Sequence, residues 1–219
     1  MEIFSQLGDF ILHFDKHLQE VIRDYGAWTY GILAFIVFAE TGFVVTPFLP
    51  GDSLLFAAGL FAHRAELNVW ILFFLLTAAA ILGNSTNYAI GRYAGHKLFR
   101  NEKAKFLNPA NLAKTHAFFE KHGPLAIVVA RFVPFARTFA PCVAGMGAMP
   151  PAKFQFYNVV GAVLWVGGFV FAGFLFAEIP VVRDSFSMVV LGIIGITLLP
   201  FVFELVRHGW RARVSRKER

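Results

Sequence analysis

Cysteine is almost absent from this sequence, since Cys142 is the only one among 219 residues. One thiol excludes an intramolecular disulfide and a metal cluster held by several thiolates. The seven histidines form no HExxH or similar pair. We therefore expect no metal site and no bound cofactor.

Charged residues are also scarce, at 16% of the chain, whereas 57% of the residues are hydrophobic and 27 are phenylalanine. Soluble domains are usually only about 45–50% apolar. The composition therefore predicts an integral membrane protein. A cleavable signal peptide is not predicted, because residues 1–26 lack a basic start and carry charges among their apolar positions.

The net charge of +6 is concentrated beside the apolar runs. Lys and Arg outnumber Asp and Glu seven to two in the polar connector at 92–122, and six to two after Phe203. The positive-inside rule makes both segments cytoplasmic, including the basic tail at 207–219. Since topology explains the basic residues and no nucleic-acid-binding motif accompanies them, we expect no nucleic-acid partner.

Hydrophobic periodicity divides the chain into the segments of one membrane domain. Apolar residues at three- and four-residue spacing predict an amphipathic helix over 1–26 that lies on the membrane surface. Long apolar runs predict three full membrane-spanning helices, at 68–91, 152–177 and 185–206.

Two further apolar regions, 28–62 and 124–149, consist of halves too short to cross a bilayer and are predicted to be re-entrant helical hairpins. Backbone N–H and C=O groups that lack helical partners within the membrane must be buried in protein or line a water-filled cavity. The cytoplasmic flanks of the second hairpin imply that the first enters from the opposite face. Residues that break a helix or free backbone groups are Pro47, Pro50 and Gly51 in the first region, and Pro134, Pro141 and Gly145 in the second.

Short matches between the two halves favour an internal repeat. Tyr25-Gly26 and Ala39-Glu40-Thr41 recur at one offset as His122-Gly123 and Ala136-Arg137-Thr138. Together with the opposite entry faces, they fit an inverted-topology repeat whose broken segments meet near the midplane and form a binding site. The predicted fold is an all-α membrane protein with two opposed re-entrant hairpins in this repeat.

Four charged residues lie in apolar surroundings: Glu40, Asp52, Arg131 and Arg137. An ionisable group at membrane depth costs at least about 2.5 kcal/mol, so each marks a functional site by default. We interpret Arg131 and Arg137 as a phosphate-binding pair, because guanidinium presents donors that match phosphate bidentately. Freed N–H groups near Gly51 and Gly145 could assist. The alternative is structural, with two buried ion pairs holding the hairpins together.

A carboxylate beside this pair is a candidate proton carrier, because burial and neighbouring charge both change its proton affinity. We expect Glu40 to be the better carrier. Asp52 follows Pro50-Gly51 and is equally well explained as a helix cap.

Polar residues within the apolar spans are interpreted more conservatively. Side chains such as Asn84, Ser85 and Asn87 usually join helices by hydrogen bonds. Asn158 and Trp165 are expected to be packing and interfacial residues.

Three segments carry a family resemblance: FLPGDSLLFAAG (48–59), ARFVPFARTFAPCVAGMG (130–147) and YNVVGAVLW (157–165). Together they resemble the bacterial DedA family over nearly the whole chain. The resemblance implies two opposed re-entrant hairpins with crossing helices in the bacterial inner membrane. It also implies movement of undecaprenyl phosphate across that membrane, with dependence on the proton motive force.

The resemblance implies functional roles for Glu40, Asp52, Arg131 and Arg137. These are the same four residues that stand out as charges in apolar surroundings. One departure is Gly83-Asn84, where related sequences have Gly-Asp. If that Asp assists proton transfer, this chain relies on the neutral amide of Asn84, which we interpret as a polar gate.

The leading hypothesis is a translocase for a polyprenyl phosphate or another anionic lipid, with protons as the coupling ion. Alternatives are a proton-coupled antiporter for small ions or drugs, a phospholipid scramblase and a structural scaffold. An enzyme is not expected, because the motifs of lipid phosphatases and alcohol phosphotransferases are missing. The sequence leaves open whether the working unit is a homodimer, since apolar faces for subunits and for lipid look alike.

Overall fold

The computed structural model describes residues 24–43, 51–64, 66–98, 123–147, 149–179 and 192. This part of the chain is helical and contains no strand, in agreement with the all-α prediction. Its elements are α3 (Trp28–Gly42), α4 (Gly51–His63), α5 (Val69–Leu98), the short 3-10 helix η1 (Gly123–Leu125), α7 (Ala126–Ala130), α8 (Pro134–Met146) and α9 (Pro151–Phe176).

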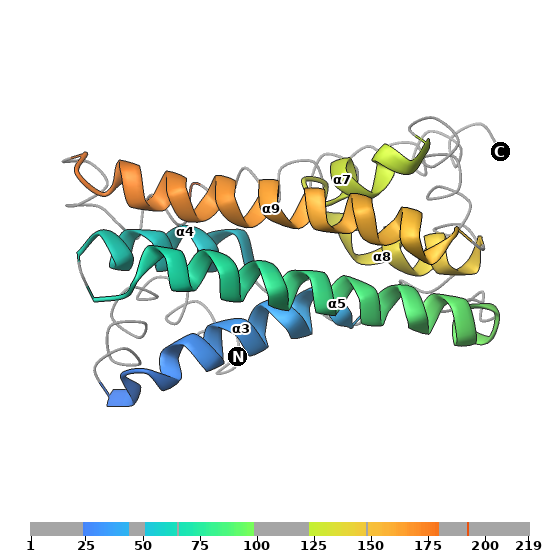
Figure 1. The fold of residues 1–219 in the computed structure, drawn as a ribbon, viewed down its shortest axis with the longest axis horizontal. Helices are drawn as coiled ribbons and strands as arrows, with labels where there is room; N and C mark the ends of the chain where they lie inside the picture. The colour runs from blue at the N-terminus through green and yellow to red at the C-terminus, as the bar shows by residue number, and fades with distance from the viewer. Residues whose placement is uncertain are drawn as a thin grey trace, which may run out of the picture.

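Two long helices, α5 and α9, run side by side along the longest dimension of the molecule (Figure 1). Both are long and apolar enough to cross a membrane, over Val69–Ala94 and Pro151–Phe176. They correspond to the spans expected at 68–91 and 152–177, although α5 continues to Leu98. Outside the described residues lie the third expected span apart from residue 192, the N-terminal amphipathic helix up to residue 23, residues 99–122 of the connector, and the basic tail.

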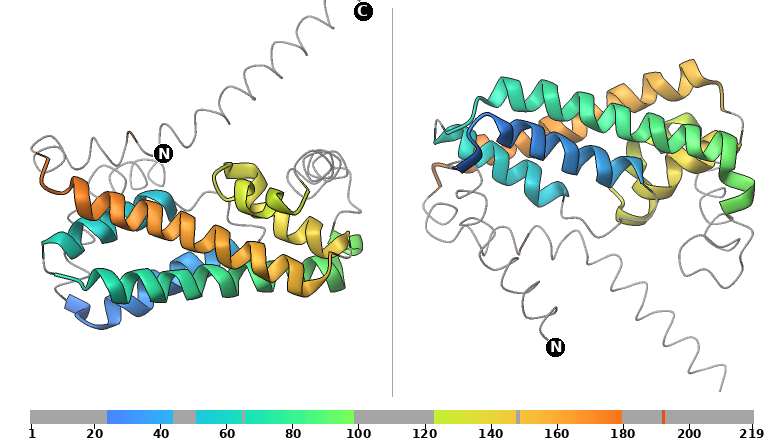
Figure 2. Two further views of the ribbon diagram at one scale, coloured as in Figure 1. Left: turned by 45° about the horizontal axis from the view of Figure 1, so that its top comes forward. Right: turned by 90° about the horizontal axis from the view of Figure 1, so that it is seen from below.

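The short helices pack on these two long ones more than on each other. Helix α4 packs mainly against α9, whereas α3 and α8 both pack against α5 (Figure 2). Thus α3 and α4, the arms of the first predicted hairpin, contact each other little and are held apart by their separate partners.

Helix α4 crosses α9 at two glycines that bring the backbones together. A Cβ atom on Gly59 would overlap the carbonyl oxygen of Val170, and one on Gly173 would overlap the carbonyl oxygen of Phe56. Only glycine permits so close an approach of backbone to backbone.

The crossing of α8 with α5 repeats this arrangement. A Cβ atom on Gly145 would overlap the carbonyl oxygen of Tyr88, and one on Gly91 would overlap that of Cys142. In both crossings the glycine and the carbonyl on each helix are three residues apart. The same spacing therefore brings each 13-residue helix onto a long helix.

The helix is interrupted between α7 and α8: α7 ends at Ala130, and α8 begins at Pro134. Pro134 occupies the start of α8, where its missing N–H costs nothing. Pro141 was also expected to break the helix, and this prediction is wrong, because α8 continues through it to Met146. The loss of one donor within a buried helix is tolerated when neighbouring helices enclose it, as α5 does here.

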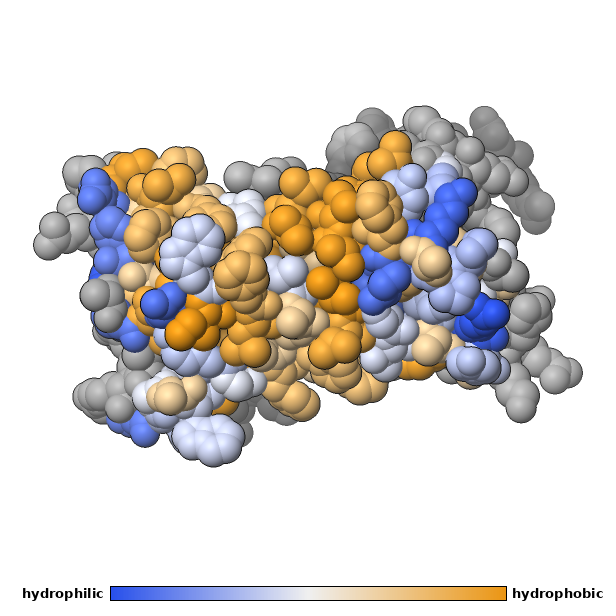
Figure 3. Space-filling view, viewed as in Figure 1, coloured by the Kyte–Doolittle hydropathy of each residue, from blue (hydrophilic) through white to orange (hydrophobic). Residues whose placement is uncertain are grey.

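Apolar side chains cover the middle of the face seen in Figure 3, while most hydrophilic residues lie toward its two ends. Many of the exposed large hydrophobic residues belong to the long helices, among them Trp70, Phe74, Leu82, Leu164 and Leu175. An apolar middle between polar ends is the surface that a bilayer requires.

Candidate functional site

The four predicted charged residues converge at the junction of the short helices. Glu40 lies near the end of α3 and Asp52 in the first turn of α4, whereas Arg131 follows α7 and Arg137 lies in α8. Glu40, Asp52 and Arg131 expose only 4%, 8% and 3% of their surface. Two positive and two negative side chains therefore share one buried region, which lowers the cost of enclosing each charge.

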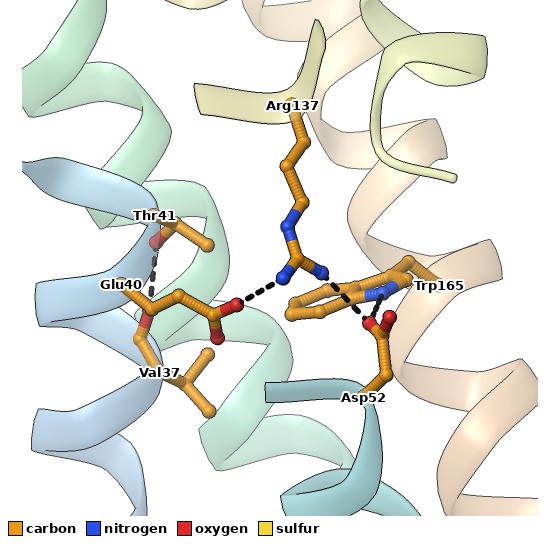
Figure 4. Close-up of polar contacts among 6 residues, drawn as sticks. All are labelled: Val37, Glu40, Thr41, Asp52, Arg137 and Trp165. Carbon is orange, nitrogen blue, oxygen red and sulfur yellow. Dashed lines mark hydrogen bonds and ion pairs between the residues drawn. The ribbon is translucent and has the colours of Figure 1, made fainter. Parts of the chain in front are cut away.

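The Arg137 guanidinium bridges both carboxylates (Figure 4). Its Nη2 lies 2.7 Å from Oε1 of Glu40, and its Nη1 donates to Oδ1 of Asp52 at 2.9 Å. The planar fork of donors makes simultaneous contact with two acceptors possible. Through this one side chain, α8 is linked to α3 and α4.

Asp52 has a second donor, because the indole Nε1 of Trp165 on α9 donates to the same Oδ1 at 2.8 Å. The Asp52 carboxylate therefore faces the site, and it also lies in the first turn of α4, where the helix dipole favours negative charge. Facing Arg137 and occupying a helix start are thus compatible roles for this residue.

The Glu40 carboxylate lies against the first residue of α4. A Cβ atom on Gly51 would overlap Oε2 of Glu40, so a larger residue at this position would push the carboxylate aside. Glu40 is thereby enclosed between the start of α4 and the guanidinium of Arg137.

Arg131 has a different environment, because its side-chain partner is a neutral amide. Its Nη2 donates to Oδ1 of Asn158 on α9 at 2.7 Å, and its Nε has no hydrogen-bond partner among the described residues. The guanidinium carbon lies 5.8 Å from the ring centre of Trp165, within cation–π range. No carboxylate in the described part of the chain is within ion-pair distance of it.

A hydrogen-bond network fixes the orientation of Asn158. Its Nδ2 lies within hydrogen-bond distance of the Ile81 carbonyl oxygen, of Ser85 Oγ and of Gln155 Oε1, at 3.1–3.3 Å. With Nδ2 directed to these acceptors, Oδ1 points toward Arg131. The amide therefore positions the guanidinium without neutralising its charge.

A small cavity, with room for about one water molecule, lies among these groups. It is lined by Glu40, Thr41, Asn84, Arg131, Arg137 and Trp165. The cavity therefore combines two cations, one carboxylate and neutral side chains. Within the described ranges, no group of three His, Cys, Asp or Glu side chains is arranged to hold a metal ion.

The structure brings together Glu40, Asp52, Arg131, Arg137 and the predicted gate Asn84, and Gly51 lies beside them. It separates Gly145 from them, because this glycine lies at the crossing of α8 and α5. Pro47 and Pro50 are outside the described residues.

Two residues of the site, Asn158 and Trp165, were assigned to packing by the sequence analysis. Trp165 does pack, being 1% exposed, but its N–H also holds Asp52. The signal for Asn158 was an amide within an otherwise apolar span, since such groups seek a polar partner. The sequence alone did not identify Arg131 as this partner.

Asn87 has the structural role that was expected of it. Its Nδ2 donates to the carbonyl oxygens of Thr41 at 3.2 Å and Thr138 at 2.9 Å. It thereby joins α5 to α3 and α8, next to the residues Glu40 and Arg137 that form the ion pair.

Comparisons with known proteins identify the family of this chain. The family model described as the VTT domain matches residues 49–175. Protein DedA of Escherichia coli (strain K12) is 52% identical over 210 residues, covering 95% of this chain and 96% of the relative. An uncharacterized membrane protein of Mycobacterium leprae (strain TN) is 40% identical, covering 81% and 79%.

The inner membrane protein YqjA of Escherichia coli (strain K12) is 34% identical over 152 residues, covering 69% of each chain. No solved structure matches this chain. The extent of the family match and the high identity to Protein DedA establish the relationship. This membrane protein therefore belongs to the DedA family of VTT-domain proteins.

Proposed function

We propose that this protein is a translocase for lipid phosphates, with undecaprenyl phosphate as substrate, in the bacterial inner membrane. The observation that carries the proposal is that Arg131 and Arg137 line one buried cavity between the long helices. The arginines bind the phosphate there while the polyprenyl tail stays in the bilayer. No chemical conversion of the lipid is part of this function.

The chemistry of the cavity suits a phosphate better than a neutral headgroup. Guanidinium groups bind phosphate oxygens through charge-assisted hydrogen bonds, which strengthen where water is excluded. Arg131 keeps an unpartnered Nε and an unneutralised charge in the described part of the chain. A neutral headgroup would offer this guanidinium no charged acceptor.

Protons are the proposed coupling ion, with Glu40 as their carrier. Its carboxylate is buried and lines the same cavity as the arginines. A proton on Glu40 would weaken its attraction to Arg137, and so release that guanidinium for the phosphate.

The proposed transport cycle uses two re-entrant hairpins related as an inverted repeat, with the connector at 92–122 and the C-terminal tail cytoplasmic. The matching glycine crossings, of α4 on α9 and of α8 on α5, support such a repeat. In proteins of this architecture, rocking of one repeat against the other exposes a central site alternately to each side.

The test is movement of undecaprenyl phosphate between the leaflets of proteoliposomes. Wild type should move the lipid, and Arg131→Gln and Arg137→Ala should reduce its rate at least about tenfold, since each removes a phosphate contact. Phosphatidylglycerol serves as the comparison lipid and should move no faster than in protein-free vesicles. Equal movement of both lipids would instead indicate a scramblase.

A proton-coupled antiporter for small ions or drugs is the second candidate, favoured by the pairing of Glu40 and Asp52 with Arg137. In that case the arginines are counter-charges and the carboxylates bind the transported cation. Proton flux that occurs without any lipid phosphate and requires a cationic solute would favour this candidate over the translocase.

A further inference from the structure

The Glu40 carboxylate lies in a setting suited to an anionic ligand. It contacts Nη2 of Arg137 at 2.7 Å on one side and lies against Gly51, the start of the 13-residue helix α4, on the other. An arginine fork and a helix start are the two elements with which proteins most often hold phosphate. The Glu40 carboxylate therefore lies where a bound anion would be expected.

Arg131 is a second cationic group on the same cavity, and it is 3% exposed. Its Nε lacks a hydrogen-bond partner in the described part of the chain, and Asn158 leaves its charge unneutralised. Since Arg131 lines the cavity and has no ion-pair partner among the described residues, it favours an anionic occupant independently of Glu40. An arriving phosphate meets Arg131 first, because Arg137 is already engaged by two carboxylates.

A phosphate is larger than the water-sized cavity, so one lining group must move when it enters. Asp52 is held by two side-chain donors, Arg137 and Trp165. In Figure 4 the Glu40 side chain reaches Arg137 from α3, on the side opposite Asp52. Glu40 is thus the carboxylate that can leave Arg137 while the other stays in place.

We propose that Glu40 occupies the phosphate position itself, so that anion binding displaces its carboxylate and the displaced group takes up one proton from solvent. The inference rests on the proposed function and adds the order of events. The charged groups that face Glu40 are Arg137 from α8, Asp52 from α4 and Arg131 from the segment after α7. Helices α5 and α9 present only neutral groups, Asn84 and Trp165, to the cavity.

Charge balance supports the exchange of a proton for the carboxylate contact. The site comprises two cations and two carboxylates, so an added anion leaves uncompensated negative charge. A proton on Glu40 removes one negative charge and ends its competition for Arg137.

The test measures binding of farnesyl phosphate, a short isoprenoid phosphate, to the full chain in lipid nanodiscs between pH 7.5 and 9. This range is well above the second ionisation of a phosphate monoester, at about 6, so the charge of the probe stays constant. Calorimetry in buffers of different ionisation enthalpy counts the protons taken up. Wild type should take up about one proton per probe, and its affinity should fall about tenfold per pH unit.

Glu40→Gln should bind the probe without proton uptake, with an affinity independent of pH and at least about tenfold tighter than wild type at pH 8.5, because the competing charge is gone. Asp52→Asn is the matched control and should keep the proton uptake. Binding by wild type without proton uptake, or uptake that survives in Glu40→Gln, would overturn the exchange while leaving the lipid-phosphate site intact. Absence of binding by both wild type and Glu40→Gln would overturn the proposed function as well.

Discussion

Arg137 contacts two carboxylates from different helices, at 2.7 and 2.9 Å, and a planar fork of donors makes this possible. Arg131 differs, because its side-chain partner is the neutral amide of Asn158. Arg137 thus has two carboxylate partners, whereas Arg131 has none within the described site. This division at the residue scale is what the proposed exchange of anion and proton uses.

Arg137→Lys should fail nearly as completely as Arg137→Ala. An ammonium presents all its donors from one nitrogen on a flexible stem, so it lacks the planar fork that binds a phosphate bidentately. We expect lipid transport by either variant to fall below about a tenth of the wild-type rate. Arg64→Lys, at an exposed position near the end of α4, is the matched control and should transport normally. Normal transport by Arg137→Lys would contradict the fork geometry.

The role of Asn158 can be tested through stability. Asn158→Leu should lower the free energy of unfolding by about 2–4 kcal/mol, because Arg131 is then buried without its amide partner. In an Arg131→Met background the same change should cost at least about 1 kcal/mol less, since the buried charge is gone. Thermal unfolding of the four proteins in detergent measures this coupling. Equal costs in both backgrounds would show that Asn158 does not act through Arg131.

At the scale of elements, the site depends on the closeness of short helices to long ones. Helix α4 carries Asp52 and α8 carries Arg137, and each is seated on a long helix at a pair of glycines. Any separation of these helices would shift the two sides of the Arg137–Asp52 ion pair relative to each other.

Gly173→Ala should therefore destabilise the protein by about 1–3 kcal/mol, because the added methyl overlaps the Phe56 carbonyl oxygen of α4. Gly168→Ala on the same helix is the matched control, since a Cβ atom there has nothing within 4 Å. Thermal unfolding should show a lower midpoint for the first variant and little change for the second. Equal effects would mean that the close approach of α4 and α9 contributes nothing to stability.

Local patterns in the sequence predicted the positions of α5 and α9, because length and hydropathy suffice for a long apolar helix. They also located the break before Pro134, where proline begins a new helix. Pro141 was wrongly predicted to break α8, because the intrinsic cost of a helical proline is offset by packing that is invisible in local sequence.

For the site, the four charges could be selected from the cost of burying them, but their pairing could not. Arg137 and Asp52 are 85 positions apart, and Trp165 is 113 positions from Asp52. Such contacts follow from how helices cross, which depends on tertiary packing rather than on spacing along the chain. Asn158 and Trp165 were therefore recognised as site residues only from the structure.

At the scale of the whole molecule, the described helices form an elongated bundle (Figure 1) whose surface is apolar in the middle and polar toward its two ends (Figure 3). Arg137 joins Glu40 and Asp52 where the short helices of this bundle meet (Figure 4). A phosphate that crosses the membrane must pass through this apolar middle. The proposed function assigns phosphate binding to Arg131 and Arg137 and the release of Arg137 to Glu40, and these three residues line the same cavity.

The measurement that tests this account most directly is movement of undecaprenyl phosphate in proteoliposomes with and without an imposed pH gradient, comparing wild type, Glu40→Gln and Arg137→Ala. We predict that the gradient accelerates movement several-fold in wild type, that Glu40→Gln moves the lipid slowly without responding to it, and that Arg137→Ala moves none above background. A Glu40→Gln variant that responds to the gradient like wild type, or movement that persists without Arg137, would contradict the account.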